Sequence, residues 1–325
     1  MKKHLVQRWF LLALAGVLAL GFGLPNEIAP LIAEVPRGGI VATVLFLMSV
    51  TLDAHAVRRA LSRPRPVILA TAINFGLVPL VAWVAVIALR SGQLIREDLL
   101  IGLLIAGAVP STLASAAVWT RRAGGNDAVS LMVTMITNLA CFVVTPLWLF
   151  WTTGTSTDIE LLPMIRRLAL LVVLPMALGQ ILRAIRPIGR WASSQKTTLG
   201  VFAQCGVLSM ILIGAVEAGT ELTPGAVRLI DWTLMLGAVA TIHLVTLWSG
   251  HALAAAVGIA REERIAVGFS GSQKTLMVGL DLALTYFAPQ PLAMLPMVAY
   301  HVVQLLLDTA VANRLRAKTP TSASP

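Results

Sequence analysis

The sequence has few charged residues and few cysteines, and both shortages exclude classes of protein. Asp, Glu, Lys and Arg make up 12% of the 325 residues. Soluble domains carry about 25% charged residues, because a folded globule must cover itself with polar surface. The two cysteines, Cys141 and Cys205, lie inside apolar runs, so no disulfide framework is implied. The chain is therefore not an ordinary soluble domain.

Motifs for common catalytic and binding chemistries are also absent from the sequence. No CxxC or HExxH spacing offers a metal site, no glycine-rich phosphate-binding loop is present, and no paired aspartates or Ser/His dyad stand at a convincing spacing. We therefore expect neither an enzyme nor a resident cofactor. The net charge of +10 could suggest nucleic acid as a partner, but the basic residues lie in short segments between apolar runs. We expect no nucleic-acid partner.

What the sequence does contain is long apolar runs. Hydrophobic residues make up 57% of the chain, and the mean hydropathy is +0.84. Runs of about eighteen or more apolar residues are typical of membrane-spanning helices, so we expect an all-α integral membrane protein whose partner is the lipid bilayer. The ten apolar segments cover roughly residues 9–24, 38–53, 66–89, 99–120, 126–151, 165–182, 199–218, 232–256, 264–286 and 293–313.

Basic residues are distributed unequally between the two sets of alternate loops. Eighteen lie in the set that includes the N-terminus, and six lie in the other set. Because basic loops remain in the cytoplasm, this distribution predicts about ten spans with both termini cytoplasmic. The first segment follows a basic start, as a signal peptide would, but no small-x-small cleavage site follows it. We interpret it as an uncleaved first helix.

Five spans in each half would place the two halves in opposite orientations. If residues 165–313 repeat the pattern of residues 1–151, the second repeat must be inverted. Inverted repeats with discontinuous helices are a common transporter architecture. Residues 314–325 are polar, and we expect a disordered cytoplasmic tail there.

The fourth apolar segment contains a proline among small polar residues. From Val109 to Ser115 it reads Val-Pro-Ser-Thr-Leu-Ala-Ser. Proline lacks a backbone N–H and clashes with the preceding turn, so it opens a helix. The hydroxyls of Ser111, Thr112 and Ser115 can satisfy the backbone groups that are freed. At a rise of about 1.5 Å per residue, Ser111 lies roughly 18 Å from Leu99, near the middle of a hydrocarbon core about 30 Å thick.

The ninth apolar segment contains a matching interruption. It reads Gly-Phe-Ser-Gly-Ser-Gln-Lys-Thr from residue 268 to residue 275, so Ser270, Gly271 and Gln273 lead up to Lys274. Lys274 lies roughly 15 Å beyond Arg264, too deep for its side chain to reach the interface. A charge at this depth costs at least about 2.5–3.5 kcal/mol and indicates a functional site. The alternative is a lysine bound by carbonyls in a purely structural role.

Polar residues also line one face of the fifth apolar segment. Ser130, Thr134 and Asn138 are four residues apart, so they share a helical face. Small polar residues often hold spans together, and a cation or substrate site beside the opened fourth span is the other interpretation. The sequence leaves both open.

Two aspartates and a histidine are expected inside spans as well. His243 lies mid-span, where hydrogen bonding to a neighbour is the expected role. Asp281 is about 10.5 Å along a helix from Lys274, too far for the two to pair within that helix. Asp308 precedes Arg314 by six residues, so we expect it near the cytoplasmic interface.

Three stretches of the sequence carry a resemblance to a known family. They are the run from Pro110 to Ser115, the turn between Arg121 and Ser130, and Gly271-Ser272-Gln273. The chain resembles the bile acid:sodium symporter superfamily over nearly its whole length, as a divergent bacterial member. The resemblance implies a bacterial-type plasma membrane, a core domain of spans three to five and eight to ten with broken spans four and nine crossing, and a panel domain of spans one, two, six and seven. In that family two sodium ions bind beside the crossing, and an organic anion binds between the domains.

The resemblance also implies ligands for a possible sodium ion. The positions that match the family's ion ligands are Ser115, Ser130, Thr134 and Gln273. Asn74 stands where the family has a glutamine on span three.

Two positions at the second break depart from the family pattern. The family's glutamate is replaced by Phe269 and its asparagine by Lys274. Even at an effective dielectric constant of about 20, like charges about 4 Å apart repel by roughly 4 kcal/mol, so an ammonium here makes sodium binding unfavourable. We therefore hypothesise that Lys274 occupies the place of a sodium ion. A desolvated ammonium can also release its proton, which would couple transport to protons.

These observations favour a secondary active transporter that moves a small organic anion by alternating access, coupled to sodium by the resemblance. The alternatives are a proton-coupled or uncoupled carrier that uses Lys274, and a non-transporting membrane regulator with the same fold. The substrate, the direction of transport and the oligomeric state are left open. The residues expected to bind substrate or ion are Asn74, Ser111, Thr112, Ser115, Ser130, Thr134, Asn138, Ser270, Gly271, Gln273 and Lys274.

Overall fold

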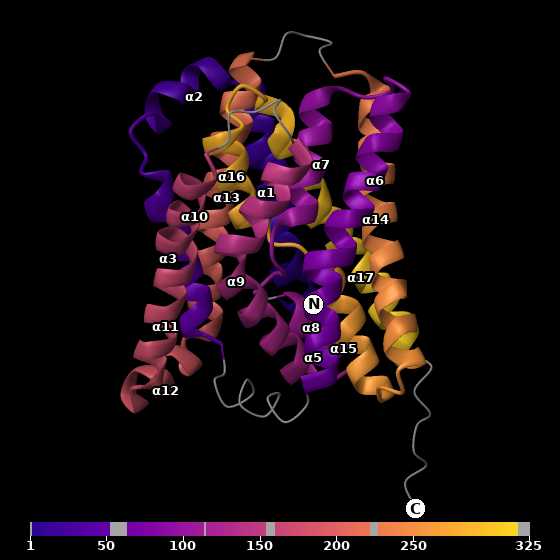
Figure 1. The fold of residues 1–325 in the computed structure, drawn as a ribbon. Helices are drawn as coiled ribbons and strands as arrows, with labels where there is room; N and C mark the ends of the chain where they lie inside the picture. Colours follow the sequence, from indigo (N-terminus) through magenta and orange to yellow (C-terminus); the bar gives the residue numbers. More distant parts are fainter. Residues whose placement is uncertain (1, 53–63, 114, 154–159, 222–226, 318–325) are drawn as a thin grey trace, which may run out of the picture.

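The computed structural model describes all residues except 1, 53–63, 114, 154–159, 222–226 and 318–325. The described part of the chain is helical and contains no strand (Figure 1), as the all-α prediction requires. The helices of the first half are α1 (Lys2–Gly23), α2 (Pro25–Ile32), α3 (Arg37–Val50), α5 (Pro64–Ala72), the π-helical η1 (Ile73–Leu77), α6 (Val78–Ser91), α7 (Glu97–Ala108), α8 (Ser115–Arg122) and α9 (Asp127–Thr153).

The helices of the second half follow in the same way. They are α10 (Leu161–Leu168), the π-helical η3 (Ala169–Val173), α11 (Leu174–Ala184), α12 (Arg186–Ser194), α13 (Lys196–Glu221), α14 (Leu229–Ala256), α15 (Arg261–Ser272), α16 (Leu276–Tyr286), the 3-10 helix η4 (Pro291–Ala293) and α17 (Met294–Ala317). Helix α17 includes residues 314–317, which the sequence placed in a disordered tail, and residues 318–325 lie outside the described part.

The described residues form six helices that are long and apolar enough to cross a membrane, or seven if the bent pair α1–α2 is one span. The two helices of that pair meet at an angle of 103°. Each of the ten predicted segments is largely helical. One of them, however, forms only the short helix α3, and two others are broken. The count of ten spans therefore stays a prediction.

Both predicted interruptions are present in the structure. Helix α7 ends at Ala108, Val109 is extended (φ −72°, ψ 159°), and the next helix, α8, begins at Ser115. Helix α15 ends at Ser272, and Gln273 is also extended (φ −72°, ψ 147°) before α16 begins. The second break is shorter than the sequence indicated, because all residues up to Ser272 remain helical.

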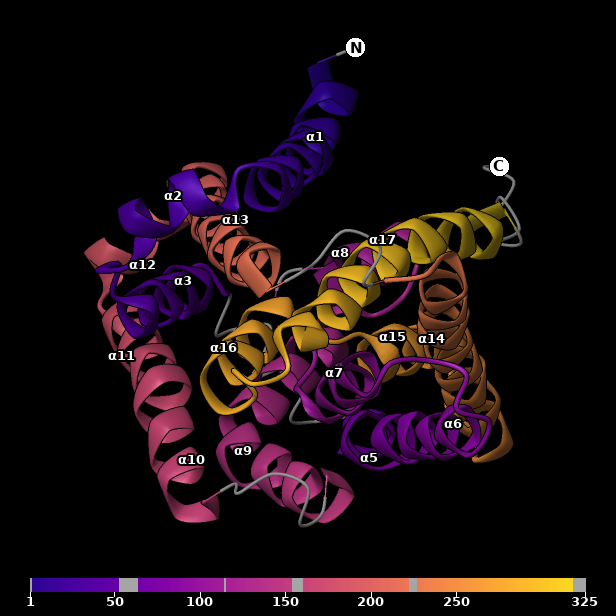
Figure 2. The same ribbon diagram turned by 90° about the horizontal axis from the view of Figure 1, so that it is seen from above.

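The helices pack in two groups that lie side by side when viewed from above (Figure 2). In the first group α13 packs against α1, α2 and α3, and α3 packs against α11. In the second group α14 packs against α15 and α17, α6 against α7, and α9 against α7, α8 and α15. Helix α10 belongs to the first group and α16 to the second. The groups meet where α9 contacts α10 and where α16 contacts α13 and α3. Both broken helices belong to the second group.

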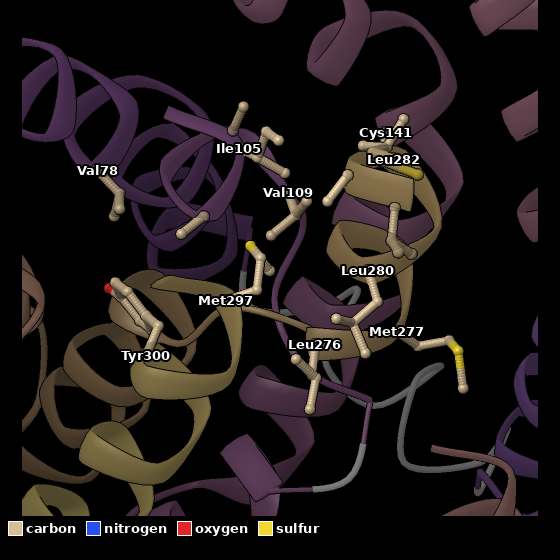
Figure 3. Packing of buried hydrophobic residues seen from close by; sticks show 14 of the residues in the cluster. Val78, Ile105, Val109, Cys141, Leu276, Met277, Leu280, Leu282, Met297 and Tyr300 are labelled. Atoms are coloured by element: carbon tan, nitrogen blue, oxygen red, sulfur yellow. The ribbon is translucent and has the colours of Figure 1, made fainter. Parts of the chain in front are cut away.

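One large apolar cluster surrounds the two breaks. Figure 3 shows Leu276, Leu280 and Met297 gathered near Val109, the first residue of the first break. All four side chains are at most 4% exposed. The two interruptions are therefore embedded in the packed interior of the second group, and their polar backbone must be satisfied by other protein groups.

Candidate functional site

The two interruptions are in direct contact. The backbone N–H of Thr275, in the second break, donates a hydrogen bond to the carbonyl oxygen of Pro110, in the first break, at 2.8 Å. Since both segments are extended, each has a backbone N–H and C=O that no helix uses. The breaks therefore satisfy part of each other's hydrogen-bonding capacity where they meet.

The side chain of Lys274 binds backbone carbonyls from two different spans. Its ammonium Nζ donates to the carbonyl oxygen of Asn74 at 2.6 Å and to that of Val109 at 2.9 Å. The residue is 1% exposed, and no carboxylate of the described residues forms an ion pair with it within 4 Å. The positive charge is thus held in the interior by carbonyl dipoles alone.

The carbonyl of Asn74 is available because of Pro79. In the π-helical segment the N–H of Val78 bonds to the carbonyl of Ile73, so the next partner in this pattern for the Asn74 carbonyl would be the nitrogen of residue 79. Proline has no N–H to donate. The carbonyl of Phe75 also has a partner outside its own helix, because the indole Nε1 of Trp148 donates to it at 2.7 Å. A π-helical turn at a functional site is a recurrent arrangement.

The side chain of Asn74 binds carbonyl oxygens at the C-terminal end of α15, just before Lys274. Its amide Nδ2 donates to the carbonyl oxygens of Gly271 at 3.1 Å and of Gln273 at 3.0 Å, with a longer contact to Ser270 at 3.4 Å. Gly271 permits this approach, because a Cβ there would lie 3.0 Å from Cγ2 of Ile73. Asn74 therefore binds the second break twice, through its backbone carbonyl and through its side chain.

Polar side chains of α9 hold the backbone of the first break. Asn138 Nδ2 donates to the carbonyl of Ser111 at 2.7 Å, and Thr134 Oγ1 donates to that of Thr112 at 3.2 Å. Thr137 accepts a hydrogen bond from the backbone N–H of Ser111 at 3.3 Å. These polar side chains of α9 thus supply hydrogen bonds to the backbone of the first break, where the helical hydrogen bonds are missing. The sequence did not single out Thr137.

A second polar cluster joins the breaks to α14 and α17. Ser115 Oγ donates to Gln273 Oε1 at 2.8 Å, and Gln273 Nε2 donates to Asp308 Oδ2. The other oxygen of Asp308, Oδ1, lies 2.8 Å from His243 Nε2. Gln273, Asp308 and His243 are each 0% exposed. Four elements therefore meet in one hydrogen-bonded chain.

Asp308 is buried among the helices, and its expected depth near the cytoplasmic interface stays a prediction. Its membership of the site was missed because spacing from Arg314 was the only guide. A signal was present in Gln304, one helical turn earlier on the same face. The side chain of Gln304 bonds to both the backbone N–H and the C=O of Lys274, at 2.9 and 3.0 Å. Helix α17 thus faces the second break over two turns.

The structure joins some of the expected sodium ligands and separates one. Ser115 and Gln273 are bonded to each other, and Thr134 is linked to them through Thr112, whose Oγ1 lies 3.3 Å from Ser115 Oγ. Ser130 instead shares a hydrogen bond of 2.7 Å with Thr120 on α8. These oxygens are neutral and already bonded to protein groups.

Three of the expected site residues have polar side-chain atoms that do not join the two breaks. The hydroxyl of Ser270 bonds to Ala266 within its own helix at 2.6 Å, and this bond gives it no link to the other break. The hydroxyl of Ser111 and the carbonyl oxygen of Asn138 are buried without a hydrogen-bond partner among the described groups. Phe269, at the place of the family's glutamate, packs in an apolar cluster with Trp119 and others. No carboxylate therefore stands at this position of the second break.

A cavity of about 400 Å³ lies between the two helix groups. The first group contributes Arg37, which forms an ion pair with Glu217. The second group contributes the end of α16 and the start of α17, including Phe287 and Met294. The cavity thus has the Arg37–Glu217 ion pair on one wall and mainly apolar side chains on the other.

Comparison with known proteins places the chain among transporters by similarity. The model of the SBF-like CPA transporter family matches residues 8–317. An uncharacterized protein of Pseudomonas aeruginosa is 27% identical, over 94% of this chain and 92% of its own. Sodium/bile acid cotransporter 7 of the mouse is 25% identical, over 85% of this chain and 82% of its own. Sodium/bile acid cotransporter 7 of Xenopus tropicalis is 24% identical, over 97% of this chain and 93% of its own.

Proposed function

The chain belongs to the SBF-like CPA transporter family, and on that premise we propose that it carries a small organic anion across a membrane by alternating access. Members of the family are transporters, so the chain is an integral membrane transporter and not an enzyme. The substrate class and the mechanism are our proposal. It rests first on the hydrogen bond between Thr275 and Pro110, which brings two opened helices together.

Opened helices in contact favour transport for a physical reason. Irregular backbone at membrane depth is tolerated only where it is buried in protein or lines a cavity. Transporters place their binding sites at such discontinuous helices, because the freed amides and carbonyls can exchange partners with an ion or a substrate. A purely structural helix bundle gains nothing from two opened spans at one place.

We propose ten spans arranged as two inverted repeats, residues 1–151 and 165–313. The six long helices, the bent pair α1–α2, the short helix α3 and the two broken helices would together supply these spans. The group around α13 would be the panel domain and the group around α14 and α15 the core domain. Both termini would then lie in the cytoplasm of a bacterial-type cell, in keeping with the loop charges.

The cavity between the two groups is the proposed place of substrate entry. Its volume of about 400 Å³ suits a small organic molecule. Arg37 supplies a positive charge that an anionic substrate could reach by displacing Glu217. The names of the vertebrate relatives mention bile acid, which is an organic anion, and this supports the same class.

The coupling ion is where this chain is proposed to differ from its sodium-coupled relatives. The Lys274 ammonium binds two backbone carbonyls beside the crossing, as a bound cation could. We propose that it permanently replaces sodium at the crossing, so that transport needs no sodium. Sodium coupling, which the relatives' names indicate, is the second candidate, and the bonded pair Ser115–Gln273 is the observation that favours it.

Uptake into proteoliposomes tests the proposal. Labelled taurocholate, a steroid sulfate, a keto acid and pantothenate are offered to wild-type protein, with sodium or choline as the external cation. We expect saturable uptake of at least one anion at equal rates in both salts. Uptake that requires sodium would overturn the replacement by Lys274, and uptake of none of the four would count against the organic anion class.

A further inference from the structure

A short cationic helix lies at the end of the sixth predicted span. Helix α12 follows α11 after the single residue Ile185, whose backbone is extended (φ −73°, ψ 112°). Figure 1 shows α12 near the same end of the molecule as α5 and α8. The basic residues of this loop belong to the set expected in the cytoplasm. We propose that α12 is a binding site for the headgroups of anionic phospholipids in the cytoplasmic leaflet.

Three cations on and beside α12 have no partner within the described part of the chain. Arg186, Arg190 and Lys196 are exposed, and they form no hydrogen bond or ion pair with a described residue. In the sequence no Asp or Glu lies between Glu160 and Glu217. The cations are therefore not balanced by carboxylates of their own segment. A positive surface of this kind attracts anions from outside the protein.

The arginines and the apolar side chains of α12 lie on different faces of the helix. Arg186 and Arg190 are four residues apart and share one face. Ile188 lies roughly 200° around the helix from Arg186, and Ala192, four residues after Ile188, is 0% exposed. Trp191 lies between the two faces and is 54% exposed. A cationic face beside an exposed indole is typical of a helix that lies in the plane of a membrane interface.

Helix α12 is held firmly against the first helix group. Ala192 packs in a small apolar cluster with Val50 of α3. Arg183, at the end of α11, donates to the carbonyl of Val50 at 2.7 Å and to the hydroxyl of Ser193 at 3.2 Å. Gly189 permits the close approach of α12 to α11, because a Cβ there would lie 2.5 Å from the carbonyl oxygen of Arg183. The cationic face is thus presented by a packed helix.

Apolar side chains beside α12 indicate its depth in the bilayer. Ile181 and Ile185, four residues apart at the end of α11, are 62% and 46% exposed. Exposed apolar side chains at the end of a span contact lipid tails, and tryptophan concentrates at the level of the headgroups. Trp191 would then lie at that level. Arg186 and Arg190, on the neighbouring face, would lie within reach of the lipid phosphates.

A phosphate group with a net negative charge is the ligand that suits these arginines. The guanidinium fork binds phosphate oxygens in a bidentate manner. Phosphatidylcholine also has a phosphate, but its choline cation cancels the charge, so the attraction favours phosphatidylglycerol. A lipid also holds its phosphate beside the helix while its acyl chains contact Ile181 and Ile185. A soluble phosphate offers no such contact.

Quenching of tryptophan fluorescence by brominated phospholipids tests the site in the reconstituted full-length protein. The bilayers contain phosphatidylcholine with increasing fractions of brominated phosphatidylglycerol or, in parallel, of brominated phosphatidylcholine. The chain has eight tryptophans, so the signal of Trp191 is the difference between each protein and the same protein with Trp191→Phe. We expect phosphatidylglycerol to quench Trp191 at least about fivefold more effectively than phosphatidylcholine at low mole fraction.

Variants of the two arginines test their contribution. Arg186→Gln with Arg190→Gln should remove most of the preference, because each cation near an anionic surface contributes about fivefold in affinity. Arg186→Lys with Arg190→Lys keeps both charges and should retain a preference. The matched control is Arg314→Gln with Arg316→Gln, which removes the same charge from two exposed arginines at the end of α17. That control should quench as wild-type protein does.

Three quenching results would overturn the site. The first is a Trp191 signal that neither lipid quenches, since Trp191 would then lie outside the bilayer. The second is equal quenching by the two lipids in wild-type protein. The third is a loss of preference in the α17 control as large as in the α12 variant, because net charge and not α12 would then decide the preference.

Two measurements on wild-type protein apply even if the variants do not fold. Raising the salt concentration from about 0.05 M to about 0.5 M screens surface charges and should weaken the preference, and a preference independent of salt overturns the proposal. Excess glycerol phosphate at constant ionic strength should leave the preference unchanged, whereas displacement would identify a soluble phosphate as the ligand. None of these measurements needs a transported substrate. Their failure leaves the proposed function standing, and absence of uptake leaves the lipid site standing.

Discussion

The ammonium of Lys274 donates to the carbonyl oxygen of Asn74 at 2.6 Å, across 200 residues of sequence. That carbonyl is free because the π-helical turn and Pro79 leave it without a backbone donor. A buried charge and a local helix defect therefore compensate each other. Each would be costly alone, since an orphaned carbonyl and an unpaired ammonium both lose their hydration.

Lys274→Met is expected to expose this dependence. The change leaves the carbonyls of Asn74 and Val109 buried without a donor, which costs about 1–3 kcal/mol for each group. Thermal unfolding in detergent should therefore begin at a clearly lower temperature than in wild-type protein. If the lysine replaces a sodium ion, added sodium should stabilise Lys274→Met more than it stabilises wild-type protein.

The comparison cation for Lys274→Met is choline, which is too large for the site. Lys274→Arg serves as the control variant, because it keeps the charge. Equal stabilisation of wild type and Lys274→Met by sodium would contradict the replacement. An unfolding temperature of Lys274→Met equal to that of wild type would show that the carbonyls do not need the ammonium.

Arg167→Met should destabilise the contact between the two helix groups. Arg167 of α10 forms two hydrogen bonds with Asp281 of α16, at 3.1 and 2.7 Å, and Asp281 is 1% exposed. Removing one partner of a buried ion pair costs about 3–5 kcal/mol, because the other charge remains buried and unpaired. Thermal unfolding of purified protein measures the loss.

The neighbouring residue Arg166 is exposed and gives a matched control. Arg166→Met should change stability by less than about 0.5 kcal/mol. The double variant Arg167→Met with Asp281→Asn should recover most of the loss, since no full charge is then left unpaired. A double variant less stable than Arg167→Met would show that the pair is not the cause.

Gly271→Ala should push the broken helix α15 away from α5 and η1. The added Cβ would lie 3.0 Å from Cγ2 of Ile73, and overpacking of this kind costs about 1–3 kcal/mol. Separation of these helices would also lengthen the hydrogen bonds from Asn74. Unfolding should occur at a lower temperature, and any measured transport should slow.

A double-mutant cycle gives the control for Gly271→Ala. Ile73→Ala removes the Cγ2 atom that the new Cβ would meet, so the two changes together should cost less than the sum of the single changes. Gly200→Ala is a neutral comparison, because a Cβ there meets nothing within 4 Å. Strict additivity of the two changes would argue against the close approach as the cause.

Asn138→Leu should release the backbone of the first break. Asn138 donates to the carbonyls of Ser111 at 2.7 Å and Thr134 at 2.8 Å, and leucine has a similar size but no donor. We expect a loss of about 1–3 kcal/mol from the orphaned Ser111 carbonyl. Thr233→Ala is the comparison, because that exposed threonine bonds only within its own helix. Equal thermal stability of the two variants would contradict a structural role for the polar side chains of α9.

The sequence alone determined the class of the protein and the places where helices break. Low charge content, long apolar runs and the distribution of basic loops predict helices in a membrane, because these signals depend on composition and local order. Pro110 and the polar run before Lys274 mark the breaks for the same reason, since a proline acts on its own turn. The resemblance of the quoted motifs to a transporter superfamily also agrees with the family match.

The tertiary structure decided which groups meet. Nothing local to Lys274 indicates that its partners are carbonyls of Asn74 and Val109, because hydrogen bonds between spans depend on how the helices pack. Asp308 was placed only by its distance to Arg314 in sequence, and the packing of α17 against α14 buries it beside His243. Local pattern can locate a polar residue along a span, but only the arrangement of the other helices determines whether that residue faces lipid, water or another side chain.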